Sequence, residues 1–195
     1  MHTAVFESVL AKLKRGGRER LDGFALEEFS GITSSEWITL VEIFKRDNDF
    51  SALSLLLSND DFFELLRNKI YSQDANSNDY VSALIYAHKF GAIDDAVERL
   101  IMAIDGLPHW PLGTALSYLS LVPIPEVMVG IYLKSLFGIV ISGEGDPVLL
   151  LKSAGEILRV KDYIPKTSDY VNMLARLRNP DKRIRLKAIS EISTL

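Results

Sequence analysis

Residues 79–106, DYVSALIYAHKFGAIDDAVERLIMAIDG, indicate the fold class. Apolar residues recur at intervals of three and four in both halves of this stretch, and that spacing places them on one face of an α-helix. Gly91 and Gly106 follow the two halves, where a helix end tolerates a positive φ. Because the connection is only a few residues long, the sequence predicts two antiparallel helices, Asp79–Phe90 and Ile93–Ile104, lying side by side.

The same period continues through most of the 195 residues, and strict alternation of apolar and polar residues is hard to find. The sequence therefore predicts an all-α fold of stacked antiparallel helical hairpins, with an irregular helical bundle as the alternative. We expect a single helical-repeat domain over residues 1–195. The polar run at 72–78 has nothing to bury, so it offers a subdivision into N-terminal helices at 1–72 and a hairpin stack at 79–195.

Helix-capping signals place the helices of the first part. Thr33-Ser34-Ser35-Glu36 has the form of a capping box, and it predicts a helix from Ser34 to about Arg46. Asp49 can cap a short helix through Leu57, and Asn59 or Asp60 can cap the next one. A further helix is expected at Glu19–Phe29.

Helix starts in the second part recur at a nearly constant interval. Starts are expected near Asp79, Leu112, Pro147 and Pro180, separated by 33, 35 and 33 residues. Asp146-Pro147 and Asn179-Pro180 each offer a cap followed by proline at the first helical position, and 107–111 reads as a rigid connector. An interval of this length suits a repeat of two helices.

The segment Asn179–Ile192 resembles the second half of a HEAT-type repeat. In that family an Asp/Asn-Pro turn is followed by a branched apolar residue and an arginine, then by a small and a final apolar residue. Ile184, Arg185, Ala188 and Ile192 occupy these positions. The resemblance implies an α-α superhelix used as a binding scaffold, because stacked repeats produce extended surfaces.

The residues that catalysis or metal binding requires are not arranged for it. The chain has no cysteine, and none of its three histidines has a second histidine or a carboxylate at the spacing that builds a metal site on one helix. No nucleophile elbow, phosphate loop or dinucleotide fingerprint is present. We therefore expect no enzyme activity, no catalytic residue, no metal and no cofactor.

The net charge of −4 conceals a polarised chain. Residues 21–105 hold sixteen acidic and six basic residues, whereas residues 152–195 hold ten basic and five acidic. An acidic surface attracts a basic protein and speeds the encounter. In size, acidity and lack of a catalytic motif the chain is similar to helical-repeat bacterial immunity proteins, which implies an antitoxin-like inhibitor that covers a basic toxin. The predicted contact residues are acidic positions and the aromatic connector: Asp60, Asp61, Asp74, Asp79, Asp94, Asp95, His109 and Trp110.

Two alternatives remain. Basic residues near the C-terminus could neutralise phosphates of a nucleic acid: Arg176, Arg178, Lys182, Arg183, Arg185 and Lys187. They alternate with apolar residues, so they also fit the solvated faces of two amphipathic helices. Alternatively, the chain is a structural or self-associating adaptor subunit, because residues 192–195 lack a polar cap.

The sequence also bears on location. The most apolar stretch, 127–141, is too short to span a membrane and is expected as a helix buried in protein. No export signal is visible at the N-terminus, and the absence of cysteine fits a reducing compartment. We therefore expect a cytoplasmic protein with a protein partner and no membrane contact.

Overall fold

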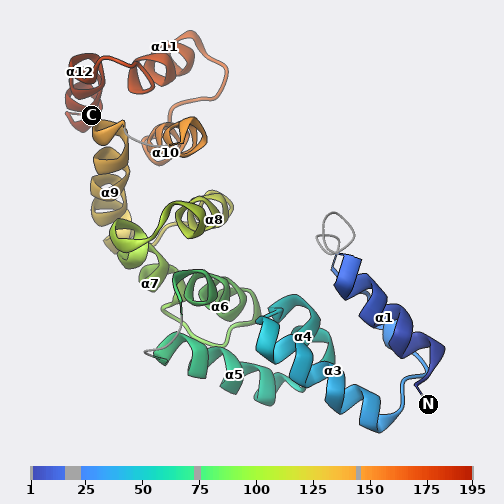
Figure 1. Cartoon of the computed structure of the whole chain (residues 1–195). Coiled ribbons are helices and arrows are strands. Elements are labelled where there is room, and N and C mark those ends of the chain that lie inside the picture. Colours follow the sequence, from blue (N-terminus) through green and yellow to red (C-terminus); the bar gives the residue numbers. More distant parts are fainter. Residues whose placement is uncertain (1, 16–22, 73–75, 144–145, 195) are drawn as a thin grey trace. The chain divides into compact units, whose positions relative to one another are not determined.

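A computed structural model describes residues 2–15, 23–72, 76–143 and 146–194 of the chain. These residues form α-helices joined by turns and short 3₁₀ segments, with no strand among them (Figure 1). The fold is all-α, as predicted. The chain divides into two compact units, Met1–Asp74 (unit 1) and Ala75–Leu195 (unit 2).

Unit 1 contains four α-helices and a 3₁₀ turn within its described residues. They are α1 (Ala4–Arg15), η1 (Leu26–Phe29), α3 (Ser34–Asp47), α4 (Phe50–Leu56) and α5 (Asn59–Tyr71). α1 contacts η1, and α4 contacts both α3 and α5.

Caps were predicted for three helices of unit 1, and the structure has the predicted cap at α3 and α4 but not at α5. The Asp49 side chain accepts from Ala52 N and begins α4, as predicted. The cap of α5 is Ser58, whose hydroxyl accepts from Asp61 N, so the prediction of Asn59 or Asp60 is wrong. A serine hydroxyl satisfies a free amide of the first turn as well as either residue would.

The predicted helix Glu19–Phe29 is also corrected. Residues 19–22 lie outside the described part of the chain, residues 23–25 are not helical, and only Leu26–Phe29 forms a 3₁₀ turn. Gly23 has φ of +70°, a left-handed conformation that does not continue a right-handed helix. The turn positions Phe29, whose ring lies in a cluster with Phe24 and Phe44 in the core.

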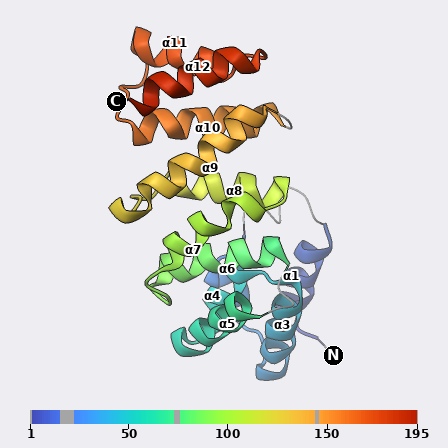
Figure 2. The same cartoon turned by 90° about the vertical axis from the view of Figure 1, so that its left-hand side faces the viewer.

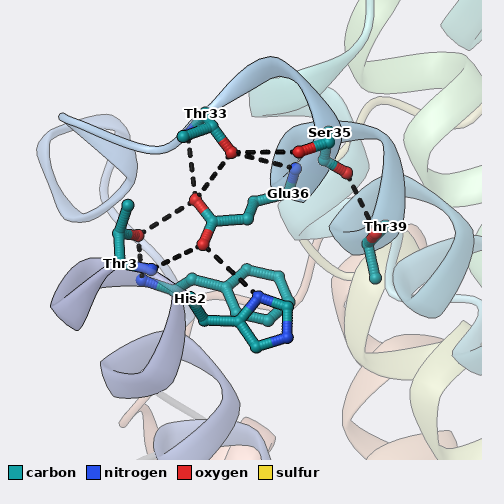
Figure 3. A network of polar contacts seen from close by, with 7 residues as sticks. His2, Thr3, Thr33, Ser35, Glu36 and Thr39 are labelled. Atoms are coloured by element: carbon teal, nitrogen blue, oxygen red, sulfur yellow. Dashed lines mark hydrogen bonds and ion pairs between the residues drawn. The ribbon is translucent and has the colours of Figure 1, made fainter.

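A network of polar contacts joins the start of α1 to the start of α3 through Glu36 (Figure 3). The predicted capping box is present, because Thr33 Oγ1 accepts from Glu36 N and Thr33 N donates to Glu36 Oε2 at 3.0 Å. The same carboxylate accepts from Thr3 N at 2.6 Å and from the Thr3 hydroxyl at 3.0 Å. Thr3 Oγ1 in turn accepts from Phe6 N in the first turn of α1. One buried carboxylate therefore supports the starts of two helices.

Hydrogen bonding dominates the ionisation of Glu36. Burial alone opposes the charged form, but hydrogen bonds from the backbone and hydroxyl groups of Thr33 and Thr3 outweigh it and lower the pKa of Glu36 to about 2. His2 Nδ1 lies 3.5 Å from Oε1 of the same carboxylate. Glu36 is thus ionised at neutral pH although its side chain is buried.

Unit 2 is a series of helices packed on one another (Figure 2). In chain order they are α6 (Ser77–Phe90), α7 (Ala96–Ala103), η2 (Ile104–Gly106), α8 (His109–Leu119), η3 (Glu126–Met128), α9 (Val129–Ser142), α10 (Pro147–Val160), α11 (Ser168–Leu177) and α12 (Lys182–Ser193).

The helices of unit 2 form two rows. One row is α6, α8, α10 and α11, in which each helix contacts the next, and the other is α7, α9 and α12. α6 packs across on α7, α9 on α10, and α11 on α12. Residues 129–141 of the apolar stretch lie in α9, which buries Leu133, Leu136 and Val140, whereas Val127 lies in η3 and is 82% exposed.

Several predicted boundaries in unit 2 shift. The connector at 107–111 is shorter than predicted, because His109, Trp110 and Pro111 form the first turn of α8. A proline there costs no hydrogen bond, since first-turn amides have no partner within the helix. Gly91 has φ of +70° and ends α6 as predicted, but Gly106 lies in the 3₁₀ segment η2 and does not have a positive φ.

The expected interval is less regular than the sequence suggested. The helices concerned start at Ser77, His109, Pro147 and Lys182, which are 32, 38 and 35 residues apart. Asp146 caps α10 as predicted, but α12 is capped by Asp181 rather than Asn179. The fourth helix also belongs to the other row, because α10 and α11 follow one another within the same row.

Arg185 connects α12 to α9. Its side chain is buried, and its guanidinium donates to the carbonyl oxygens of Asn179 at 2.6 Å, Pro180 at 2.9 Å and Ile141 at 3.1 Å. Ile141 belongs to the last turn of α9, where carbonyls have no partner within the helix. A Cβ added at Gly143, which has φ of +57°, would collide with this guanidinium.

Candidate binding groove

A hollow lies on the row formed by α8, α10 and α11. It has a volume of about 700 Å³ and is bordered by α8, α10, the connector 161–167 and Tyr170 of α11. A second hollow of about 290 Å³ lies between the N-terminal halves of α8 and α10. Ser117 and Lys152 line both, so we treat them as one groove, the α8–α10 groove.

The two helices that form the groove run parallel. His109 Nε2 and Asp146 Oδ2, at the N-terminal ends of α8 and α10, are 3.7 Å apart. At the opposite end Arg159 Nη2 donates to Leu119 O at 3.2 Å. The groove therefore extends along the length of both helices.

Exposed apolar side chains border the groove. Trp110, at the start of α8, is 78% exposed, and Val148 opposite it on α10 is 51% exposed. Leu151 and Ile164 line the larger hollow and are also exposed. Exposed aromatic and aliphatic side chains around a concave surface are typical of binding sites.

Glu156 lies in the larger hollow, but its carboxylate is engaged within the chain. The Arg159 guanidinium contacts it at 2.9 Å, and the buried Tyr132 hydroxyl donates to Oε2 at 3.2 Å. Burial of Tyr132, together with the Glu156 charge, raises the pKa of its hydroxyl, while the hydrogen bond to Glu156 raises the pKa of Arg159. This trio links α9 to α10.

Lys152 differs from Glu156 in the kind of partner that its side chain binds. It is half-buried at the centre of the groove, and its Nζ donates to Gly113 O at 3.2 Å and to Ser117 Oγ. Both partners are uncharged. Among the residues that the structure describes, no carboxylate lies within ion-pair distance of this ammonium group.

The predicted contact residues are dispersed. Only His109 and Trp110 line the groove. Asp60 and Asp61 are exposed in the first turn of α5 in unit 1, and Asp61 accepts from the Ser58 hydroxyl. Asp74 lies outside the described residues.

The other predicted acidic residues lie in unit 2 beside α6 and α7. Asp79 is in the first turn of α6 and accepts from Asn76 Nδ2 at 3.0 Å. Asp94 and Asp95 are exposed in the turn between α6 and α7. Arg99 hydrogen-bonds to Asp95 at 2.8 Å and lowers its pKa, so Asp94 is the freer of the two carboxylates.

The six predicted nucleic-acid contacts do not form one exposed row. Arg185 is buried and bound to backbone carbonyls, and Arg176 is paired with Glu191 at 2.6 Å and 2.7 Å. The remaining four are exposed: Arg178, Lys182, Arg183 and Lys187. The sequence shows that charged and apolar residues alternate here, but it does not show which charged side chains are buried or paired in the fold.

Sequence reasoning missed Lys152 and the α8–α10 groove. In the sequence Lys152 is the single lysine of an amphipathic helix, and only its position opposite Gly113 and Ser117 distinguishes it. The available signals were His109 and Trp110, which lie between Pro108 and Pro111 and were predicted as contact residues.

Neither protein-family models, nor curated protein sequences, nor solved structures gave a match to this chain. Among the described residues, no group of three or more histidines and carboxylates is arranged to hold a metal ion. None of the helices in the described ranges has both the length and the apolar character needed to cross a bilayer.

Proposed function

We propose that this chain is a non-enzymatic protein-binding protein that receives a segment of its partner in the α8–α10 groove. The observation that supports this proposal is an apolar groove with an exposed tryptophan at its edge. The carboxylate of Glu156 and the guanidinium of Arg159, which also line the groove, are already bound to each other. Such a surface suits association, in which aromatic anchors contribute much of the affinity. The HEAT-like resemblance of 179–192 and its scaffold role are part of the same proposal.

The test is affinity for the native partner. A complex isolated from the source organism would be reconstituted from purified components and titrated by calorimetry. We expect Trp110→Ala to weaken binding at least tenfold, about 1.4 kcal/mol, because a central aromatic anchor is lost. Met102→Ala is the matched control, since Met102 is 64% exposed on α7 and does not line the groove. Equal affinities for the two variants would refute the groove as the binding site.

A second candidate is an antitoxin-like inhibitor that covers a basic toxin with acidic residues. It is favoured by the exposure of Asp60, Asp61 and Asp94. Asp94→Asn would then slow association and reduce its dependence on salt, because exposed charges act mainly through steering. An association rate unaffected by salt would count against this candidate. A cytoplasmic location, consistent with the absence of cysteine, belongs to this proposal too.

Nucleic-acid binding and self-association have less support. Two of the six predicted basic contacts, Arg176 and Arg185, are engaged within the fold. A gel shift with random duplex at low salt tests the first alternative, and light scattering over a range of concentrations tests the second.

A further inference from the structure

We propose that the α8–α10 groove selects a short apolar peptide segment carrying a single carboxylate, which pairs with Lys152. This inference rests on the proposed function and specifies the chemistry of the partner.

The argument begins with the bonding capacity of Lys152. An ammonium group has three donors and no acceptor. Gly113 O and Ser117 Oγ accept two of them, which leaves one donor and an uncompensated charge in the groove. A half-buried charge with only neutral partners favours an incoming group of opposite sign, because the pair is less screened there than in bulk water.

Besides Glu156 and Arg159, which are bound to each other, two other charged groups line the groove, and they limit the ligand to one acid. Asp146 lies six residues before Lys152, about 9 Å along the helix axis, and Asp162 lies at the opposite end, in the connector. Both are acidic and would repel a polyacidic chain or a nucleic acid that filled the groove. A carboxylate near Lys152 avoids both of them.

Apolar surface on either side of Lys152 defines the rest of the ligand. Trp110 and Val148 border the groove toward the helix starts, and Leu151, Ile164 and Tyr170 border it toward the connector. An 11-residue helix such as α8 is about 16 Å long, which accommodates about five extended residues. The expected motif is therefore an aspartate or glutamate with apolar residues on both sides.

The test is selection of random ten-residue peptides, displayed on phage, against the full-length chain. We expect enriched peptides to contain one acidic residue between apolar ones and to lose binding to Trp110→Ala. A synthetic version of the best peptide would then be compared with its Asp→Asn or Glu→Gln form on the wild-type chain and on Lys152→Met. The neutral peptide should bind the wild type at least tenfold more weakly, whereas the two peptides should differ less than twofold on Lys152→Met.

The outcomes separate the two proposals. Peptides that need Trp110 but show no preference for an acid, or no coupling to Lys152, would overturn this inference and leave groove binding intact. The absence of any Trp110-dependent peptide would overturn both. Binding of a random 20-nucleotide single strand that depends on Lys152 would also overturn the single-carboxylate rule. Should Lys152→Met unfold, as circular dichroism would show, Lys152→Gln and the peptide substitution alone still decide the question.

Discussion

The α1–α3 junction of unit 1 and the α8–α10 groove of unit 2 both hold a charged side chain away from bulk water, but they use it differently. The Glu36 carboxylate is saturated by donors from Thr3 and Thr33. The Lys152 ammonium has two neutral acceptors and no described counter-ion. A charge that the fold buries and binds on several sides stabilises the structure, whereas a half-buried one with a free donor is available to a partner. Arg185 also has only neutral partners, but it is buried and bound by three backbone carbonyls, so it is a structural charge like Glu36.

The largest effect is expected at Arg185. Arg185→Leu removes three charge-assisted hydrogen bonds of a buried guanidinium and leaves three part-buried carbonyls without that donor, so it should lower the free energy of unfolding by about 3 kcal/mol. Urea unfolding followed by circular dichroism measures it. Arg183→Leu is the control on the same helix, since the Arg183 side chain is 91% exposed, and it should change stability by less than about 0.5 kcal/mol. Similar losses in the two variants would contradict the structural role of Arg185.

At neutral pH, Glu36→Gln should cause the next largest loss in the free energy of unfolding. The reason is that the amide group of glutamine places a donor opposite the donors of Thr3 and Thr33. The effect should depend on pH. The pKa of Glu36 is lowered to about 2 from its ordinary value of 4.5, so its stabilisation is complete above about pH 4.5 and is lost as the pH falls toward 2. Unfolding midpoints at pH 7, 4 and 3 should show the difference between wild type and Glu36→Gln shrinking with acidity. A difference that stays constant would show that the carboxylate charge is not what matters.

A smaller effect is expected at the C-terminal end of α9. Gly143→Ala should destabilise the chain by about 1 to 2 kcal/mol, because the residue has a left-handed φ and the new Cβ would meet the Arg185 guanidinium. Gly138→Ala, in the same helix with open space around it, is the control and should be neutral or slightly stabilising. Thermal melting of both variants checks this, and equal shifts would argue against the contact.

The smallest effect on stability is expected in the groove. Lys152→Met should change the free energy of unfolding by less than about 1 kcal/mol, because it exchanges two hydrogen bonds to neutral groups for additional apolar contact. Chemical denaturation measures the change. A loss as large as that of Arg185→Leu would place Lys152 among the structural charges and would erase the contrast between the two regions.

Local signals in the sequence predicted local structure well. The capping box at Thr33 and Glu36, the caps at Asp49 and Asp146 and the helix end at Gly91 all follow from residues within a few positions of one another. Together with the apolar period they were sufficient for the all-α class.

Contacts between distant residues could not be predicted in this way. Thr3 and Glu36 are 33 residues apart, Ser117 and Lys152 35, and Ile141 and Arg185 44. The HEAT-like pattern marks Arg185 and not Arg183, but no local signal shows that packing buries the first and leaves the second in water. The groove could not be predicted for the same reason, since it exists only where α8 and α10 lie side by side.

The bond from Arg185 to Ile141 also affects how unit 2 opens. The terminal hairpin of a linear array normally frays first, because it has a neighbour on one side only. Here α12 packs on α9, and Arg185 also binds the last turn of that helix, so releasing α12 leaves the Ile141 carbonyl of α9 without this donor. Amide hydrogen exchange should accordingly protect α12 to nearly the same degree as α9, and the two helices should open as one cooperative segment.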